Sequence, residues 1–278
     1  MILVIGRTGQ VAIELARLDP EVQCVGRETV DLTQPDRLAA FLADTPAKAI
    51  INAAAYTAVD AAEAEPAVAH AVNAVAVGVM AQHAARVDIP FVHISTDYVF
   101  SGGGTVPWHE TDPVAPQNVY GQSKLSGEAQ VTEAGGVHAI LRTSWVFSAH
   151  GSNFLKTMLR LSESRDHLTI VADQIGGPTP ARAIAQACLM LARSVTRHTS
   201  GIYHFSGAPD ASWADFARDI FKAAGREVAI ENIPTSAYPT PATRPLNSRL
   251  NCDKIKTTFD IARPDWRAAT QDIVRQLT

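Results

Sequence analysis

The chain has 278 residues, of which 46% are hydrophobic and 19% charged, and its formal net charge is −4 at pH 7. This composition is typical of a folded protein with a sizeable core and excludes the strongly basic character of a nucleic-acid-binding protein. The three cysteines form neither a CxxC pair nor a metal-binding spacing, so we expect free thiols in a reducing compartment.

The chain begins MILVIG, which predicts a strand rather than a signal peptide because no basic segment precedes it and no cleavage site follows. No apolar stretch approaches the roughly 20 residues of a membrane span. We therefore expect a cytoplasmic protein with no membrane partner.

The first half alternates short apolar runs with helical patterns. The runs are β-branched and nearly continuous, as strands buried on both faces should be. They fall at 1–5, 22–26, 49–55, 90–95 and 137–144, and the helical patterns at 10–18, 34–43, 66–86 and 119–134. This alternation predicts an α/β fold, a Rossmann-type doubly wound parallel sheet with helices on both faces.

The second half is less regular. Helices are predicted near 152–164, 181–194, 213–224 and 267–277, and strands at 168–172 and 201–207. The proline-rich segment 233–250 cannot be a continuous helix or central strand. It is either a disordered linker or, as we favour, an ordered loop over a cleft. We predict a dinucleotide-binding domain of residues 1–148 with part of 175–200, and a smaller substrate domain mainly of 149–174 and 201–278.

A glycine-rich turn follows the first apolar run. Gly6, Gly9 and Ala12 have the spacing GxxGxxA and open the first predicted helix. Backbone N–H groups at such a turn can bind a pyrophosphate, which the helix dipole favours. The turn predicts dinucleotide binding, with a purely structural turn as the alternative.

Residues after the second run bear on the choice of cofactor. An acid at this strand end would favour NAD, but the sequence has Arg27, whose guanidinium suits a 2′-phosphate. Asp31 and Leu32 follow as further candidate cofactor residues, with Asp31 near the adenine edge. We expect NADPH, with NADH as the alternative, and a solvated surface arginine is the other interpretation of Arg27.

Tyr120 and Lys124 form the candidate catalytic pair. Their spacing of four places both side chains on one face of the helix predicted at 119–134. A nearby ammonium is expected to lower the pKa of the phenol toward neutrality, so that it can exchange a proton. Thr96 ends the run before this helix, at the sheet edge where ligands bind in open α/β folds. Its hydroxyl can donate to a carbonyl oxygen.

This order of glycine turn, threonine, tyrosine and lysine resembles the extended short-chain dehydrogenase/reductases. Several segments resemble more specifically the dTDP-4-dehydrorhamnose reductases, nearly from end to end. They are GRTGQV (6–11), INAAAYTAVDAAE (51–63), STDYVFSG (95–102), PQNVYGQSK (116–124), RTSWVF (142–147), NFLKTMLRL (153–161), DQIGGPT (173–179) and TSAYPTPATRPLNSRLN (235–251).

The resemblance implies a role for particular residues. Thr96 and Tyr120 would contact the C4 carbonyl of a dTDP-4-dehydro-6-deoxysugar, and Tyr120 would protonate it as NADPH delivers hydride. The implied cofactor contacts are Gly9, Gln10, Val11, Ala53, Ala54, Tyr56 and Lys124. The implied nucleotide-sugar contacts are Asp97, Tyr98, Trp145, Asn153 and Arg244. Core packing for Trp145 and an ion pair for Arg244 are alternatives.

Some members of this family dimerise through a magnesium ion held by glutamates. Here Glu14 occupies the first such position, but Arg182 stands where the second would fall, and an arginine repels the cation. We therefore predict no metal site, and a monomer or weak homodimer without that interface.

Other functions compete with this one. A sugar-nucleotide dehydratase would need a glutamate after Asp97, where Tyr98 stands, whereas a 4-epimerase uses the same threonine, tyrosine and lysine. A reductase of another dTDP-4-keto-6-deoxysugar is the principal alternative. A non-catalytic regulatory subunit of a methionine adenosyltransferase is the third, and the retained Thr96, Tyr120 and Lys124 disfavour it.

Overall fold

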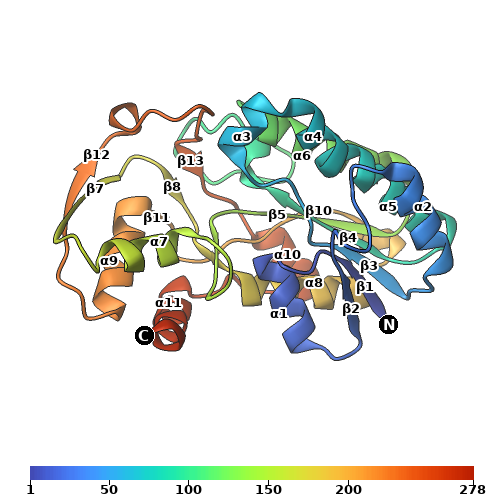
Figure 1. The fold of residues 1–278 in the computed structure, drawn as a ribbon. Helices are drawn as coiled ribbons and strands as arrows, with labels where there is room; N and C mark the ends of the chain where they lie inside the picture. Colours follow the sequence, from blue (N-terminus) through green and yellow to red (C-terminus); the bar gives the residue numbers. More distant parts are fainter.

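A six-stranded parallel sheet forms the centre of the larger lobe in the computed structural model, which describes residues 1–278 (Figure 1). Its strand order is β10-β5-β4-β3-β1-β2. The strands are β1 (Ile2–Ile5), β2 (Val22–Val25), β3 (Ala49–Asn52), β4 (Phe91–Thr96), β5 (His138–Thr143) and β10 (Gly201–His204). The order reverses at β1 and β3, so the predicted doubly wound Rossmann-type sheet is confirmed. Ligands bind such sheets at the carboxyl ends of the strands beside this reversal.

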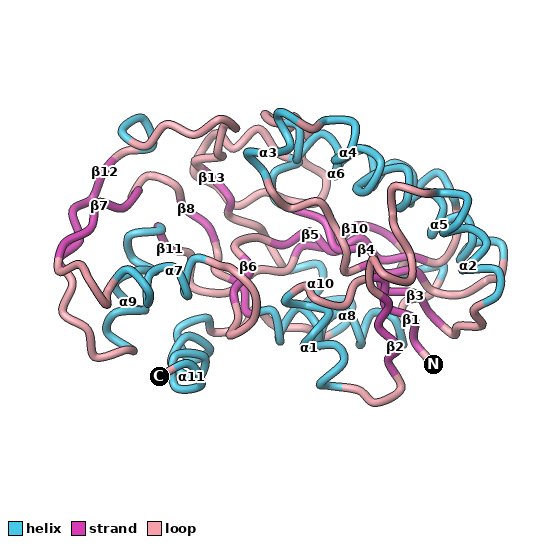
Figure 2. The backbone as a smooth tube through the Cα atoms, viewed as in Figure 1, coloured by secondary structure: helices cyan, strands magenta, loops and turns pink.

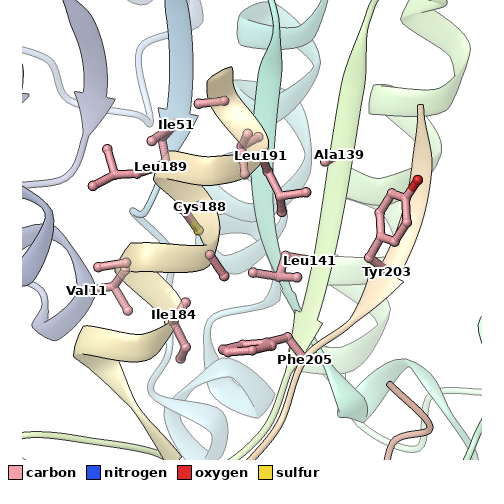
Figure 3. Close-up of a cluster of buried hydrophobic side chains, with 14 of the residues drawn as sticks. Val11, Ile51, Ala139, Leu141, Ile184, Cys188, Leu189, Leu191, Tyr203 and Phe205 are labelled. Atoms are coloured by element: carbon pink, nitrogen blue, oxygen red, sulfur yellow. The ribbon is translucent and has the colours of Figure 1, made fainter. Parts of the chain in front are cut away.

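Helices cover both faces of the sheet, because successive strand residues point to opposite sides. Leu3 and Ile5 pack under one layer, which contains α2 (Pro35–Asp44), α5 (Ala76–Arg86) and α6 (Val119–Ala134). Ile2 and Val4 pack on the other, which contains α1 (Gln10–Leu18), α8 (Ala181–Ser194) and α10 (Asp253–Phe259). Figure 3 shows Ile184, Cys188 and Leu191 of α8 directed at the strands of this second face.

The stretch predicted as one helix over 66–86 contains a π-helical turn. It consists of α4 (Pro66–His70), η1 (Ala71–Val75) and α5, and α3 (Val59–Ala64) precedes it. The helix Pro66–Arg86 is 21 residues long and apolar enough to cross a membrane by length and composition, which corrects the expectation that no stretch approaches that length. Half of the most apolar 18-residue stretch of this helix is buried within the protein. Packing against the sheet and α6 therefore accounts for its apolar composition.

The smaller lobe forms the left-hand part of the molecule in Figure 2. It has its own core, built around Phe147, Phe216 and Trp266. Its main elements are α7 (Phe154–Leu161), β7 (His167–Val171), α9 (Trp213–Ala223), β12 (Ala229–Ile233) and α11 (Trp266–Leu277). Short elements join the lobes or lie at their edges: β6 (Val146–Phe147), β8 (Ile175–Gly176), β9 (Thr179–Pro180), β11 (Ala211–Ser212), β13 (Asn247–Ser248), η2 (Asp97–Val99), η3 (Arg197–Thr199) and η4 (Thr235–Ala237).

The chain crosses between the lobes more often than the expected domain boundaries suggest. Residues 201–278 were assigned mainly to the substrate domain, but β10 pairs with β5 as the edge strand of the large sheet. Ile255 of α10 likewise lies in the core beneath that sheet. Sequence periodicity identifies these elements but not their partners, because strand pairing depends on distant residues.

The proline-rich segment 233–250 is an ordered loop attached to both lobes. Thr235 at its start donates from its backbone and side chain to Asp173 of the smaller lobe. Near its other end, Ala242 and Arg244 donate to Asp60 of α3. The favoured expectation of an ordered loop is confirmed, and the segment spans the space between the lobes.

Candidate active site

The glycine-rich turn lies between β1 and α1. Gly6 has φ +125°, and a Cβ there would stand 3.2 Å from the backbone of Ala53 and Ala54. Gly9 is the N-cap of α1, and a Cβ on it would meet only the Ala53 carbonyl oxygen, at 3.9 Å. Gln10 and Val11 begin the helix, whose first N–H groups have no acceptor within it. The turn therefore offers an approachable set of backbone donors at the switch point of the sheet.

The end of this turn near β2, where the sequence predicts the adenosine, is exposed and carries two ion pairs. Arg27 has 82% of its side chain exposed, and its Nη2 lies 3.1 Å from Asp31 Oδ2. Arg7, which sequence reasoning did not single out, donates to Glu28 at 2.6 Å. The hydrogen bonds from Thr33 and then Arg27 hold the pKa of Asp31 below its usual value. Two guanidiniums thus stand near the end of β2.

Leu32 differs from its neighbours at this end. Its side chain is buried in the core beneath α2 and α5. The buried side chain supports the loop, and contact of Leu32 with the cofactor stays a prediction.

Ala53, Ala54 and Tyr56 follow β3, as expected from the sequence. The Tyr56 hydroxyl donates to Glu65 at 2.6 Å, and this hydrogen bond raises the pKa of the phenol. Asn73, in the π-helical turn η1, accepts from the Tyr56 backbone N–H at 2.8 Å and donates to its carbonyl at 3.0 Å. The π turn therefore fixes the loop that follows β3.

Thr96, Asp97 and Tyr98 lie where β4 runs into η2. Thr96 Oγ1 donates to Asp97 Oδ1 at 3.1 Å and accepts from the Tyr98 backbone N–H at 3.2 Å. Burial raises the pKa of Asp97 to about 6, although its hydrogen bonds to hydroxyl groups act in the opposite direction. The Ser248 hydroxyl also acts on this carboxyl, but neither it nor Asp97 Oδ2 makes a hydrogen bond of normal length to a protein group.

Tyr120 lies beside this turn, in the first turn of α6. Its ring meets that of Tyr98 edge-on, with 5.6 Å between centroids. Burial raises the pKa of Tyr120, and a hydrogen bond with Thr96 acts against that shift. The expectation that Lys124 lowers this pKa toward neutrality is wrong for this structure, because Lys124 donates elsewhere. Tyr120 is protonated at neutral pH and can act as a proton donor.

Lys124 is 1% exposed, one turn further along α6. Its Nζ donates to the Ile94 carbonyl at 2.6 Å and lies 3.3 Å from His93 Nε2. Burial lowers the pKa of Lys124 to about 8, while the charge of Glu128 acts to raise it. The lysine therefore titrates close to physiological pH.

A buried ion pair supports this helix from below. Glu128 accepts from Arg142 of β5 at 2.9 and 2.6 Å and from Ser95 at 2.6 Å. Both charged side chains are at most 3% exposed. Nothing in the sequence pattern identifies this pair, since its members lie on a helix and a strand that meet only in the fold.

Trp145 lies where the chain enters the smaller lobe. Its backbone φ is +48°, a positive value that residues other than glycine rarely adopt. Its indole stacks on Trp213, with centroids 3.6 Å apart and planes 10° from parallel. The Trp213 Nε1–H donates to Gln174 at 3.0 Å. Trp213 was not predicted as a site residue, because only the fold brings α9 beside the end of β5.

Asn153 and Arg244 both bond to protein groups. The Asn153 amide donates to Gln10 Oε1 at 2.9 Å and accepts from Lys156 N, which caps α7. Arg244 Nη2 donates to Asp60 at 2.6 Å, which is the ion pair considered as its alternative role. Asn153 therefore joins the smaller lobe to the phosphate loop, and Arg244 joins the proline-rich segment to α3.

Glu14, the residue considered for a metal bridge, lies among one histidine and two arginines. It lies 2.7 Å from His150 Nε2, 3.6 Å from Arg182 Nη1 and 3.8 Å from Arg17 Nη1. No group of three or more His, Cys, Asp or Glu side chains is arranged to hold a metal ion. The absence of a metal-bridged dimer stays a prediction, now with a named set of competing contacts.

Comparisons with known proteins agree on one family. The family model of the RmlD substrate binding domain matches residues 1–278. A dTDP-4-dehydrorhamnose reductase of Sinorhizobium fredii is 45% identical over 98% of this chain and 95% of its own, and one of Burkholderia thailandensis is 48% identical over 99% and 98%. The crystal structure of a Bacillus anthracis dTDP-4-dehydrorhamnose reductase in complex with NADP superposes with a TM-score of 0.93 at 31% identity, covering 99% of this chain and 98% of that one.

Proposed function

The chain belongs to the dTDP-4-dehydrorhamnose reductase family, and from this premise we propose that it reduces the C4 keto group of dTDP-4-dehydro-β-L-rhamnose with NADPH. The observation that carries the proposal is that Thr96, at the carboxyl end of β4, is hydrogen-bonded to Tyr120 of α6, while Lys124 of the same helix is anchored on β4 at Ile94. The product is dTDP-L-rhamnose.

The residues at the phosphate turn fit a dinucleotide. Open space at Gly9 permits close approach to the first N–H groups of α1, which suit a pyrophosphate. Arg27 and Arg7 supply guanidiniums at the adenosine end, where a 2′-phosphate would need positive charge. Ala53, Ala54 and Tyr56 line the neighbouring strand end. NADPH fits this arrangement better than NADH does, because no acid ends β2.

Tyr120 is the proton donor in this proposal. The bound nicotinamide supplies hydride to C4, and the oxygen that becomes basic takes the Tyr120 proton. A phenol with a raised pKa stays protonated until the alkoxide forms, and then transfers its proton because the alkoxide is a far stronger base. The Thr96 hydroxyl donates to the same oxygen and turns from Asp97 to do so. Lys124 holds the nicotinamide ribose and influences Tyr120 through that contact.

Residues between the lobes form the sugar-nucleotide side. Asp97 Oδ2 is available to accept from a sugar hydroxyl, and Tyr98 lies against Tyr120. Trp145 has one indole face covered by Trp213, so its other face is the one available to the apolar side of a deoxysugar. Arg244 can pair with a phosphate if it leaves Asp60. We assign Asn153 to positioning Gln10, since its amide is occupied by protein groups.

The location and assembly of the chain complete the proposal. We expect a cytoplasmic enzyme that acts as a monomer or weak homodimer, since the arginines near Glu14 compete with a bridging metal. Sedimentation with and without magnesium chloride tests the predicted oligomeric state. A magnesium-dependent dimer would contradict it.

The proposed function is tested by measuring oxidation of the reduced nicotinamide, which is monitored as a loss of its absorbance. The purified protein is given NADPH or NADH together with dTDP-4-dehydro-6-deoxyglucose, with and without a 3,5-epimerase. Oxidation that requires the epimerase supports the proposal, and the two rates compare the cofactors. Oxidation without the epimerase points to a reductase of another 4-keto sugar, and no oxidation points to an epimerase or a regulatory subunit.

A further inference from the structure

His93 is a buried histidine whose two ring nitrogens both face nitrogen atoms. It lies in β4 with no exposed surface. Its Nδ1 is 3.1 Å from Asn52 Nδ2, and its Nε2 is 3.3 Å from Lys124 Nζ. Burial, and then the charge of Lys124, lower the pKa of His93 well below its usual value, so the ring is neutral. A neutral imidazole has one N–H donor and one acceptor, which constrains the two contacts.

Asn52 decides which ring nitrogen accepts. Its Oδ1 accepts from the Ala54 backbone N–H at 3.2 Å, so its Nδ2 faces His93 and can only donate. His93 Nδ1 is therefore the acceptor, and the ring proton is on Nε2. This N–H points at Lys124 Nζ, which can accept it only as a neutral amine. Lys124 can donate to Ile94 in either charge state.

Protonation of Lys124 conflicts with this arrangement. An ammonium has no lone pair, so it needs His93 Nε2 as an acceptor. Lys124 then takes the ring proton from Nε2 while Nδ1 takes one from solvent, a net uptake of one proton. Asn52 must turn its oxygen toward Nδ1–H, and the hydrogen bond from Ala54 is lost.

We propose that His93 is a positioning residue that couples the charge on Lys124 to the backbone at Ala54 through the side chain of Asn52. The proposal deepens the proposed function, on which it rests for the roles of Lys124 and Ala54. It gives the enzyme a proton-dependent link between the lysine and the strand end that lines the cofactor site.

The groups around Lys124 set the pH at which it gains or loses its proton. The charged or titratable groups that act on Lys124 are His93 from β4 and Glu128 from α6 itself, and Arg142 from β5 is paired with Glu128. Tyr120 lies one turn earlier on α6, and Asp97 acts on it. Arg142 holds Glu128, so the acid is not free to neutralise Lys124 alone. With the pKa of Lys124 near 8, both states are populated at neutral to mildly alkaline pH.

The first experiment uses the free protein and needs neither cofactor nor substrate. Nitrogen-15 NMR reports the tautomer of His93 and the amide shift of Ala54 between pH values on either side of about 8. We expect the Nε2–H tautomer at high pH, the Nδ1–H tautomer at low pH, and an Ala54 shift with the same midpoint. One tautomer throughout, or an unchanged Ala54 amide, would overturn the proposal.

The second experiment compares His93→Gln with the wild-type enzyme. A glutamine oxygen accepts from the ammonium without any tautomer change, so the charged lysine is favoured. We expect the Lys124 limb of the kcat–pH profile to move up by about one unit. His83→Gln is the matched control, because His83 is a buried histidine that contacts Arg86 instead.

The outcomes of the second experiment separate the two proposals. An inactive wild-type enzyme would count against the proposed function, while the NMR measurement would still decide the role of His93. An active wild type whose pH profile is unchanged by His93→Gln would refute the coupling alone. A shift in both variants would mean that any buried histidine substitution moves the profile, and would also refute it.

Discussion

The catalytic end of the site and its adenosine end differ most in exposure. Thr96, Asp97 and Lys124 are at most 5% exposed, whereas the side chains of Arg27 and Arg7 are 82% and 63% exposed. Charges in a buried region interact strongly and their pKa values move, but surface pairs are screened by water and salt. We therefore expect the interior of the site to set its chemistry, and its surface to set the choice of cofactor phosphate.

Different physical terms dominate at each end. At the catalytic end, burial is the largest cause of the shifts at Tyr120, Lys124 and Asp97. At the adenosine end, hydrogen bonds to exposed partners cause the modest shift at Asp31. Substitutions at the buried end should accordingly have large effects, and those at the exposed end small, salt-dependent ones.

Removing the Tyr120 hydroxyl gives the largest expected effect. Tyr120→Phe keeps the ring and its contact with Tyr98 but removes the proton donor, so kcat should fall by about 10²–10⁴-fold. The affinity for NADPH, measured by fluorescence, should be nearly unchanged. Tyr238→Phe is the control, since that phenol is 60% exposed on the proline-rich segment. A Tyr120→Phe enzyme with near-normal kcat would show that the proton comes from elsewhere.

Breaking the buried ion pair beneath α6 should be the next largest effect. Glu128→Gln leaves Arg142 without its counterion, and the Arg142 Nη1 already lacks a hydrogen-bond partner. Loss of one member of a buried pair costs about 3–5 kcal/mol in the free energy of unfolding. Urea denaturation measures the change. Glu133→Gln, at an exposed site on the same helix, should change stability by less than about 0.5 kcal/mol.

The buried lysine makes stability depend on pH. The pKa of Lys124 falls from 10.5 to about 8 in the folded protein, so the unfolded chain binds more protons between these values. Stability therefore rises with pH through this window, by at most about 1.4 kcal/mol per unit, and is lost as pH falls through 8. Lys124→Met should remove this slope. The free energy of unfolding is measured against pH for the wild type and for Lys124→Met, and the difference between the two curves cancels the other titrating groups. If the two curves ran parallel, the side chain of Lys124 would be solvated rather than buried.

The sequence predicted the local motifs at both ends of the site, but not the partners that their residues meet in the fold. The turn with Gly6 and Gly9 and the helix with Tyr120 and Lys124 follow from local spacing, because each motif lies within one strand–helix unit. The partners His93, Glu128 and Trp213 were not predicted. His93 lies on the same strand as Thr96, and Glu128 on the same helix as Lys124, but their contacts join that strand to that helix, and Trp213 comes from the other lobe. No local pattern identifies such contacts.

One error has a simple electrostatic origin. The sequence spacing brought Tyr120 and Lys124 to one face, and a direct effect of the lysine on the phenol was inferred from that. In the fold the Lys124 Nζ bonds to Ile94 and approaches His93, and burial dominates the pKa of Tyr120. A spacing rule gives the face of a helix but not the groups that compete for a charge once it is buried.

The smallest expected effect lies at the exposed end and tests the comparison most directly. Arg27→Ala should lower kcat/KM for NADPH by about tenfold and leave that for NADH nearly unchanged, because an exposed guanidinium contributes only modestly to a phosphate contact. The loss should shrink as salt is added, since the Debye length falls from about 10 Å at 0.1 M to about 3 Å at 1 M. Arg37→Ala on α2 makes the same charge change at another exposed position and should affect neither cofactor. An NADPH preference that survives Arg27→Ala at all salt concentrations would mean that Arg7 or a buried group selects the phosphate, and the division between the two ends would then fail.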